Sequence, residues 1–235
     1  MRAAKSWVII FPMATRHVIW DWNGTLLNDA WLCVEILNGM LKERNLPPVT
    51  EHIYREVFTF PVVNVYRTMG FDVSAVEFEK ASYEYIEAYQ ARRSECQLQI
   101  GAADALSTFM RAGIGQSILS AYRQDMLDSI IREMGIEKYF QRLSGNTNIF
   151  AASKVEYGRT LVSDIGLPKG DIVMIGDTKH DYEVASELGI RCVLVSCGHC
   201  SRERLTVLGA PVVDSLDDLV GKIVVPRGSV AIRGL

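Results

Sequence analysis

Short apolar segments alternate with amphipathic segments along most of this 235-residue chain, and this alternation limits the possible folds most strongly. The apolar runs have the length of strands, and such runs are typical of strands buried on both faces of a sheet. They lie at 17–21, 114–121, 171–177, 190–196 and 210–214. Helical patterns lie at 101–113, 123–135, 153–166 and 180–189. Strands that alternate with helices predict an α/β fold whose parallel sheet carries helices on both faces.

One long segment interrupts the alternation, because residues 30–96 contain helical patterns and no convincing buried strand. We therefore expect a small all-helical domain inserted after the first strand. The predicted parts are a discontinuous Rossmann-like core at 13–29 and 97–225, the helical insert at 30–96, and loose termini at 1–12 and 226–235. The N-terminal apolar stretch is too short to cross a bilayer, so translation from Met13 or a loosely held extension is expected.

Charge and cysteine content exclude several classes of protein. The net charge of −3 is spread along the chain, and no basic run indicates nucleic-acid or membrane binding. Five cysteines are an odd number in a chain of this size, which argues against a disulfide framework and favours a cytoplasmic protein. Cys197 and Cys200 form a lone C-G-H-C pair, for which zinc or redox chemistry is the alternative to ordinary thiols.

Polar residues follow the predicted strands at the points where those strands end. Asp21 ends the first strand, Ser120 ends the second, Lys154 begins a helix, and Asp177 and Asp181 follow the strand at 171–177. Ligands of open parallel sheets bind at this edge. Neighbouring carboxylates favour Mg²⁺, and a hydroxyl with a lysine suits a phosphate.

Each of these residues also has an ordinary structural role open to it. Ser120 could simply end a strand, Lys154 could be solvated, and the aspartates at 177 and 181 could cap the next helix. Asp21 is harder to explain in this way, because a carboxylate at the end of an apolar run is unfavourable if it is merely buried. Their occurrence together and in order favours a functional site.

Four motifs in this order resemble those of the haloacid dehalogenase (HAD) superfamily of phosphotransferases. They are DWNGT at 21–25, the Ile-Leu-Ser ending at Ser120, Lys154, and GDTKHD at 176–181. The helical insert resembles the family's small C1-type cap, which closes over the site and selects the substrate. Residues 58–72 resemble the cap of the branch that includes phosphoglycolate phosphatase. The resemblance implies a hydrolase acting on a small phosphorylated metabolite.

The resemblance also implies a nucleophile and a metal site. Asp21 would attack phosphorus to form an aspartyl-phosphate. The Asp21 side chain, the Asn23 main-chain carbonyl and Asp177 would hold Mg²⁺. Asp181 would support the metal directly or through another ligand.

The remaining implied roles concern the phosphoryl group and the substrate. Ser120 and Lys154 would bind the phosphoryl oxygens, and Lys154 would offset their charge. Gly24 would let the backbone turn and approach the phosphate, and Thr25 would orient the nucleophile. From the residues alone, Arg123 and Arg55 are candidates for contacting the substrate. Either a monomer or a homodimer is expected.

Position 23 departs from the family pattern, because the family's phosphatases carry an aspartate there that acts as general acid and base. An amide exchanges no proton, and acid–base catalysis typically contributes about 10²–10⁴-fold. The Asn23 amide is nearly the same shape and could still donate a hydrogen bond to the leaving oxygen. His180 and His199 could substitute as acids, although we expect both to be solvated loop residues. Deamidation of the Asn23–Gly24 pair is a further possibility.

Three functions therefore compete. The first is a Mg²⁺-dependent phosphatase with an altered acid–base step, which hydrolyses a phosphomonoester or a phosphoanhydride; turnover would be least affected where the leaving group needs no proton, as in an acyl phosphate or a phosphoanhydride. The second is a phosphonate hydrolase, which would need Lys42 or Lys80 of the insert to form a Schiff base. The third is a phosphate-binding module without turnover. We favour the first, because every other catalytic position is filled.

Overall fold

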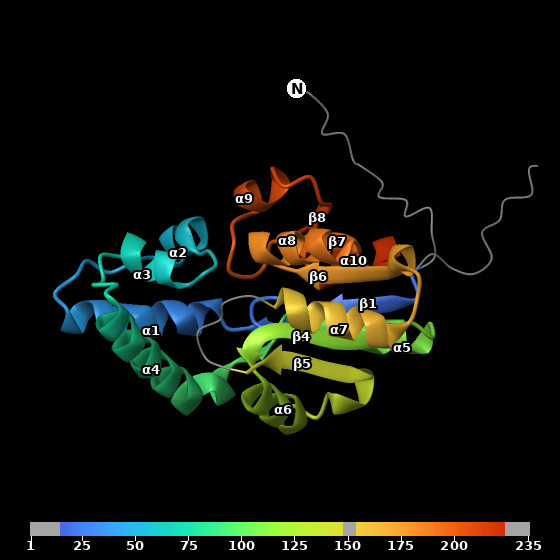
Figure 1. Ribbon diagram of the computed structural model, residues 1–235, viewed down its shortest axis with the longest axis horizontal. Helices are drawn as coiled ribbons and strands as arrows, with labels where there is room; N and C mark the ends of the chain where they lie inside the picture. Colours follow the sequence, from blue (N-terminus) through green and yellow to red (C-terminus); the bar gives the residue numbers. More distant parts are fainter. Residues whose placement is uncertain (1–14, 148–153, 224–235) are drawn as a thin grey trace, which may run out of the picture.

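The computed structural model describes residues 15–147 and 154–223 of the chain. Within them, a six-stranded parallel sheet runs in the order β5-β4-β1-β6-β7-β8 (Figure 1). Its strands are β1 His17–Trp20, β4 Gly115–Arg123, β5 Arg142–Asn146, β6 Ile172–Gly176, β7 Arg191–Val195 and β8 Val212–Val213. The predicted α/β class is confirmed. The termini expected to be loose, 1–12 and 226–235, lie outside the described residues.

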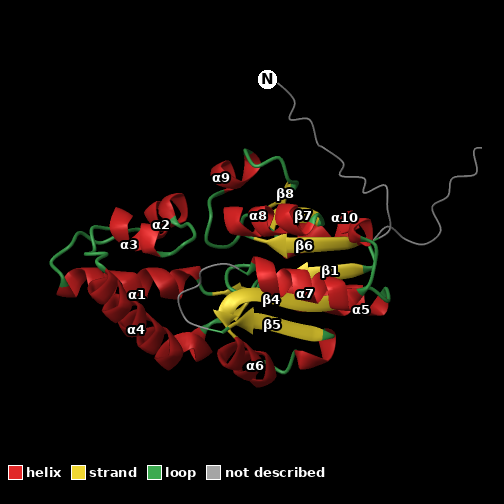
Figure 2. Ribbon diagram, in the orientation of Figure 1, coloured by secondary structure: helices red, strands yellow, loops and turns green. Residues whose placement is uncertain are grey.

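Helices cover both faces of this sheet (Figure 2). Strand side chains alternate between the faces, so that Val18 and Trp20 of β1 enter one apolar cluster and Ile19 enters another. The first face is covered by α5 Ala102–Arg111, α6 Gln124–Glu133 and α10 Leu216–Ile223. The second is covered by α7 Val155–Ile165 and α8 Lys179–Leu188. A short helix, α9 Arg202–Thr206, follows β7.

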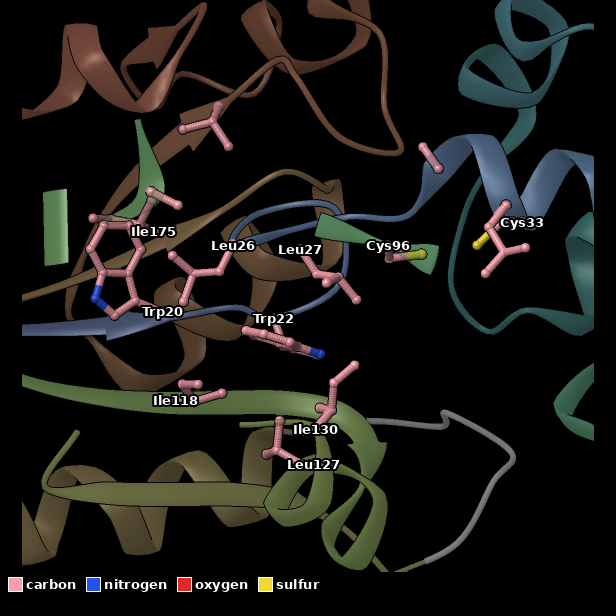
Figure 3. Close-up of a cluster of buried hydrophobic side chains, with 14 of the residues drawn as sticks. Trp20, Trp22, Leu26, Leu27, Cys33, Cys96, Ile118, Leu127, Ile130 and Ile175 are labelled. Atoms are coloured by element: carbon pink, nitrogen blue, oxygen red, sulfur yellow. The ribbon is translucent and has the colours of Figure 1, made fainter. Parts of the chain in front are cut away.

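The larger apolar cluster runs from the sheet into the inserted helices (Figure 3). Trp20, Trp22, Ile118 and Ile175 are fully buried in it, and Cys33 of the insert belongs to the same cluster. Each such side chain contributes about 1.5–3 kcal/mol of transfer free energy. The insert therefore packs directly on the core beside the carboxyl end of β1.

Residues 30–96, which we call the cap, fold as helices at the carboxyl ends of the strands (Figure 1). The helices are α1 Ala30–Glu43, α2 Glu51–Val57, α3 Val63–Thr68, α4 Ala75–Arg92 and the short η1 Arg93–Glu95. The sequence shows three helical patterns in this segment, at 30–45, 50–58 and 75–93, and α3 lies outside them. The chain enters and leaves the cap through an antiparallel pair, β2 Leu27–Asn28 and β3 Gln97–Leu98.

One strand differs from the sequence-based expectation at its end. The apolar run predicted a strand over 114–121, but β4 continues to Arg123. Its pairing with β5 shifts between Leu119 and Arg123, where Arg123 lies opposite Asn146. This irregularity lets the strand continue past Ser120 and turn the next residues toward the cap, so that Ala121 and Arg123 line a cavity there.

Candidate functional site

The five polar residues predicted at the strand ends lie together. Lys154 reaches into the centre, where its Nζ is 2.5 Å from Asp21 Oδ1 and 2.6 Å from Asp181 Oδ1. Its side chain is only 2% exposed. The alternative interpretation, in which Lys154 is a solvated residue at a helix start, is therefore wrong. Asp21, Ser120 and Lys154 line a small cavity of about 50 Å³. A carboxylate, a hydroxyl and a cation thus face one space.

Three buried carboxylates form the second part of the site. Oxygen atoms of Asp21, Asp177 and Asp181 lie within 4.8 Å of one another. Burial raises the pKa of Asp21, and Asp181 and Asp177 raise it further against the opposing effect of Lys154. Burial likewise raises the pKa of Asp177 to about 6. One ammonium cannot balance three carboxylates, and this all-oxygen set suits a divalent cation such as Mg²⁺.

Asp181 has a structural role as well. Its Oδ2 accepts a hydrogen bond from Thr178 N at 3.0 Å, and its own N–H donates to Thr178 Oγ1 at 3.4 Å, which together form a capping box at the start of α8. Its other oxygen holds Lys154. Asp181 can therefore cap the helix and take part in the site at once. The capping box fixes the orientation of its carboxylate.

The turn after β1 brings Gly24 and Thr25 against Asp177. Thr25 was expected to orient the nucleophile, but its Oγ1 donates to Asp177 Oδ1 at 2.8 Å. Gly24 has a φ of +77°, and a Cβ there would overlap the Asp177 carboxylate and approach His199 Cδ2 to 2.5 Å. Asp177 and His199 thus pack closely against the turn, and this approach is possible because Gly24 has no side chain.

The amide of Asn23 is already fully engaged. Its Nδ2 donates to Asp29 Oδ2 at 2.7 Å and to the Tyr89 hydroxyl at 2.9 Å. An amide nitrogen has two hydrogens, so neither is left for a leaving oxygen. The expectation that this amide would donate to the leaving group is wrong for this conformation, and Asn23 instead ties the core to the cap.

Asp29 is the centre of a buried polar network that sequence reasoning missed. It accepts from Gly24 N at 2.8 Å and from the Tyr89 hydroxyl at 2.7 Å, and its Oδ1 lies 3.4 Å from His199 Nε2. His199 Nδ1 is 2.8 Å from the Tyr54 hydroxyl. The sequence feature that could have revealed this network is Asp29 itself, a second aspartate eight residues after Asp21 and just beyond an apolar pair.

Both histidines expected to be solvated are buried, so that expectation is wrong. Burial lowers the pKa of His199, but the Asp29 carboxylate outweighs this and raises it to about 9. His199 is therefore a cation paired with Asp29 at neutral pH. His180 packs on the Phe60 ring with a centroid distance of 4.8 Å, and burial lowers its pKa. His180 is thus a neutral packing residue.

The candidate substrate arginines are engaged elsewhere. Arg123 lines a larger cavity below the cap, but its guanidinium binds both oxygens of Asp125 at 2.5 and 2.6 Å. Arg55 is absent from the lining of both cavities. It pairs with Glu51 at 2.7 Å and donates to Cys197 O at 3.3 Å. Arg55 thus joins the cap to the core.

The chain is similar in sequence to known proteins. A family model described as haloacid dehalogenase-like hydrolase matches residues 18–195. The tyrosine-protein kinase PtkA of Mycobacterium tuberculosis is 26% identical over 212 residues, which are 87% of this chain and 72% of that protein. Phosphoglycolate phosphatase of Synechococcus elongatus is 23% identical over 192 residues, 80% and 87% of the two chains.

Solved structures show the same fold. The crystal structure of a predicted phosphatase from Clostridium acetobutylicum superposes with a TM-score of 0.76 at 20% identity, over 90% of this chain and 99% of that one. The structure of PtkA from M. tuberculosis gives a TM-score of 0.75 at 23% identity, over 90% and 99% of the two chains. The matched segment, 18–195, contains all four sequence motifs.

Proposed function

Because the chain belongs to the haloacid dehalogenase-like hydrolase family, and is an enzyme of that phosphatase and hydrolase type, we propose that it is a Mg²⁺-dependent phosphatase using Asp21 as nucleophile. One observation carries the proposal. The Asp21 carboxylate shares a cavity with Ser120 and Lys154 and lies among the carboxylates of Asp177 and Asp181. This is a complete set for binding a phosphoryl group and attacking it.

The residues divide the work as follows. Asp21, Asp177, Asp181 and the main-chain carbonyl of Asn23 would hold Mg²⁺, which supplies charge neutralisation for the nucleophile and the phosphate. An oxygen of Asp21 attacks phosphorus, the bond from phosphorus to the leaving oxygen breaks, and that oxygen keeps the electron pair. Lys154 and Ser120 Oγ stabilise the phosphoryl oxygens during transfer. Water then hydrolyses the aspartyl-phosphate and regenerates Asp21.

The leaving group is restricted by Asn23. This side chain has no acidic proton, and its amide hydrogens are bound by Asp29 and Tyr89. A substrate therefore has to release a stable anion, as an acyl phosphate or a phosphoanhydride does. The acid–base contribution, typically about 10²–10⁴-fold, is then not required.

The phosphonate-hydrolase alternative needs a lysine of the insert at the site, and neither candidate lies there. Lys42 and Lys80 are both exposed, and neither is among the residues that line the two cavities. Lys80 pairs with Glu77 at 2.6 Å. A binding module would bind phosphate without releasing it from a substrate, which separates it from a phosphatase.

The experiment is phosphate release with Mg²⁺ from acetyl phosphate and from glycerol phosphate, an alkyl ester. We expect acetyl phosphate to be cleaved at least about 10²-fold faster than glycerol phosphate, because only the alkoxide leaving group of glycerol phosphate needs a proton. Chelation of Mg²⁺ by EDTA should stop the reaction, and added Mg²⁺ should restore it. No release from either compound would overturn the proposal in favour of a binding module.

Replacement of Lys154 by methionine should separate binding from turnover. The ammonium holds Asp21 and Asp181 together, so its loss should strengthen Mg²⁺ binding by removing a competing cation. Acetyl phosphate turnover should nevertheless fall about 10²–10³-fold, because the phosphoryl oxygens lose a buried positive charge. Calorimetry with Mg²⁺ and phosphate release measure the two effects.

The matched control for that variant is Lys179→Met. Lys179 is 57% exposed and pairs with Glu183 on the surface of α8. Its loss should leave both Mg²⁺ affinity and turnover unchanged. If Lys154→Met retains wild-type turnover, Lys154 has no part in phosphoryl transfer.

We also propose a cytoplasmic monomer or homodimer that acts on a small metabolite and binds neither nucleic acid nor membrane. The five free cysteines and the absence of a basic run support this. Among the helices described for residues 15–147 and 154–223, none combines the length and apolarity needed to cross a bilayer.

A further inference from the structure

A second, larger cavity lies between the cap and the core and adjoins the phosphoryl site. Its volume is about 150 Å³. Five residues line both cavities: Asn23, Phe58, Phe60, Ala121 and His199. A phosphoryl group placed beside Asp21 would therefore direct its leaving group past Asn23 into the larger cavity.

The walls of the larger cavity are mostly apolar. Leu37, Val62, Val65, Ile86 and Met126 supply aliphatic groups, and Phe58, Phe60 and several tyrosines supply rings. The tyrosine hydroxyls are largely turned to other partners. Tyr89 donates to Asp29, Tyr54 binds His199, and the Tyr122 hydroxyl accepts from Gln90. A ligand would meet the faces and edges of these rings.

Charged groups at this cavity are already neutralised. Among the described residues that line it, those with a formal charge are Asp29, His199 and Arg123. Asp29 and His199 form a buried pair, and Arg123 is bound by both oxygens of Asp125. A carboxylate on the ligand would thus lose its hydration, and it could gain a cation only by displacing Asp125 from Arg123, which makes it less favourable than an uncharged group.

We propose that the substrate is an aryl or aroyl monophosphate, whose leaving group is an uncharged aromatic ring on a phenolic or carboxylic oxygen. This rests on the proposed phosphatase function. An apolar cavity of about 150 Å³ has room for one benzene ring. Aliphatic walls with ring edges and faces suit a planar aromatic group.

The chemistry of the leaving group points to the same class. When the bond from phosphorus to oxygen breaks, a phenol leaves as phenolate and an aroyl group leaves as carboxylate. Both anions hold the electron pair far better than an alkoxide does. Neither needs the proton that Asn23 cannot supply. The cavity and position 23 therefore restrict the substrate independently, and both restrictions meet in aryl and aroyl phosphates.

Binding can be tested with two non-hydrolysable phosphonates that differ in a single group. Benzylphosphonate places a phenyl ring, and phosphonoacetate a carboxylate, one carbon from phosphorus. With Mg²⁺ present, calorimetry should show benzylphosphonate binding on the order of 10- to 100-fold more tightly, as expected for burying one ring. Equal binding, or tighter binding of phosphonoacetate, overturns the proposal.

A variant of the cavity wall should reverse this preference. Ile86 lies on α4 and lines the cavity, so Ile86→Lys would place a cation in it. We expect benzylphosphonate binding to weaken at least tenfold and phosphonoacetate binding to strengthen. Val76→Lys is the matched control, because Val76 is 62% exposed on the same helix. A preference that Ile86→Lys leaves unchanged places the ring elsewhere and overturns the proposal.

Turnover separates this proposal from the one on which it rests. Benzoyl phosphate and acetyl phosphate have similar leaving-group acidity, and kcat/KM should favour benzoyl phosphate by at least about tenfold. Equal kcat/KM values overturn the aromatic specificity and leave the phosphatase intact. If neither compound is hydrolysed while the phosphonate preference persists, the phosphatase function fails and the ligand class stands.

Discussion

The Asp21→Asn variant is expected to lose essentially all phosphatase activity, by about 10⁴-fold or more, because the group that attacks phosphorus is gone. Asparagine has nearly the same shape, so the fold should persist. Lys154 would keep its partner Asp181 at 2.6 Å. Rapid-quench phosphate release from benzoyl or acetyl phosphate measures the loss.

A covalent readout makes this prediction sharper. Intact-mass spectrometry after brief mixing with acetyl phosphate should detect a phosphoryl adduct on the wild type, and acid quenching should preserve it. The adduct should be absent from Asp21→Asn and present in Asp104→Asn, which alters an exposed carboxylate of α5. An adduct on Asp21→Asn would show that another residue is the nucleophile.

The rim of the site was predictable from the sequence for a simple geometric reason. Parallel strands end at the same edge of their sheet, so residues that follow apolar runs must gather there. Asp21 and Asp177 follow adjacent strands, β1 and β6, and Ser120 lies on β4 at the other side of β1. Strand order and spacing alone therefore bring these side chains together.

The contacts across the cap were not predictable in the same way. Periodicity shows that α2 and α4 have buried residues, but it does not show which of these meet the core. Tyr54 and Tyr89 reach His199 and Asp29 because of the angle at which the cap packs. That angle depends on many tertiary contacts together, and no local pattern encodes it.

Side-chain directions were a second limit. Thr25 follows Asp21 by four residues, and only the turn at Gly24 decides that its hydroxyl points to Asp177. Arg123 was a candidate for contacting an anionic substrate, but its guanidinium pairs with Asp125, two residues later in the chain. Short elements such as α3 and the β2–β3 pair also escaped, because they contain too few residues to show a period.

The Asn23→Asp variant is expected to gain activity toward alkyl phosphates of about 10²-fold or more, because an acid is restored beside the leaving oxygen. The new carboxyl would lie where the amide now meets Asp29, at 2.7 Å. Two carboxylates at that distance repel, so the pKa of one rises and its proton is retained near neutral pH. The retained proton is the one that an alkoxide needs. Phosphate release from glycerol phosphate measures the gain.

Two further variants decide whether the proton is the cause. Asn23→Ala keeps the main-chain carbonyl but has no acid, so it should cleave acetyl phosphate and remain inactive on glycerol phosphate. The second variant combines Asn23→Asp with Asp29→Asn. The hydrogen bond between positions 23 and 29 persists with donor and acceptor exchanged, and the carboxylate at position 23 no longer faces a second carboxylate. Its pKa then returns toward normal, and the alkyl phosphatase optimum should move to lower pH than in the single variant. If Asn23→Asp cleaves acetyl phosphate normally and gains nothing on glycerol phosphate, proton supply at position 23 does not limit this enzyme, because the added acid would otherwise have been used.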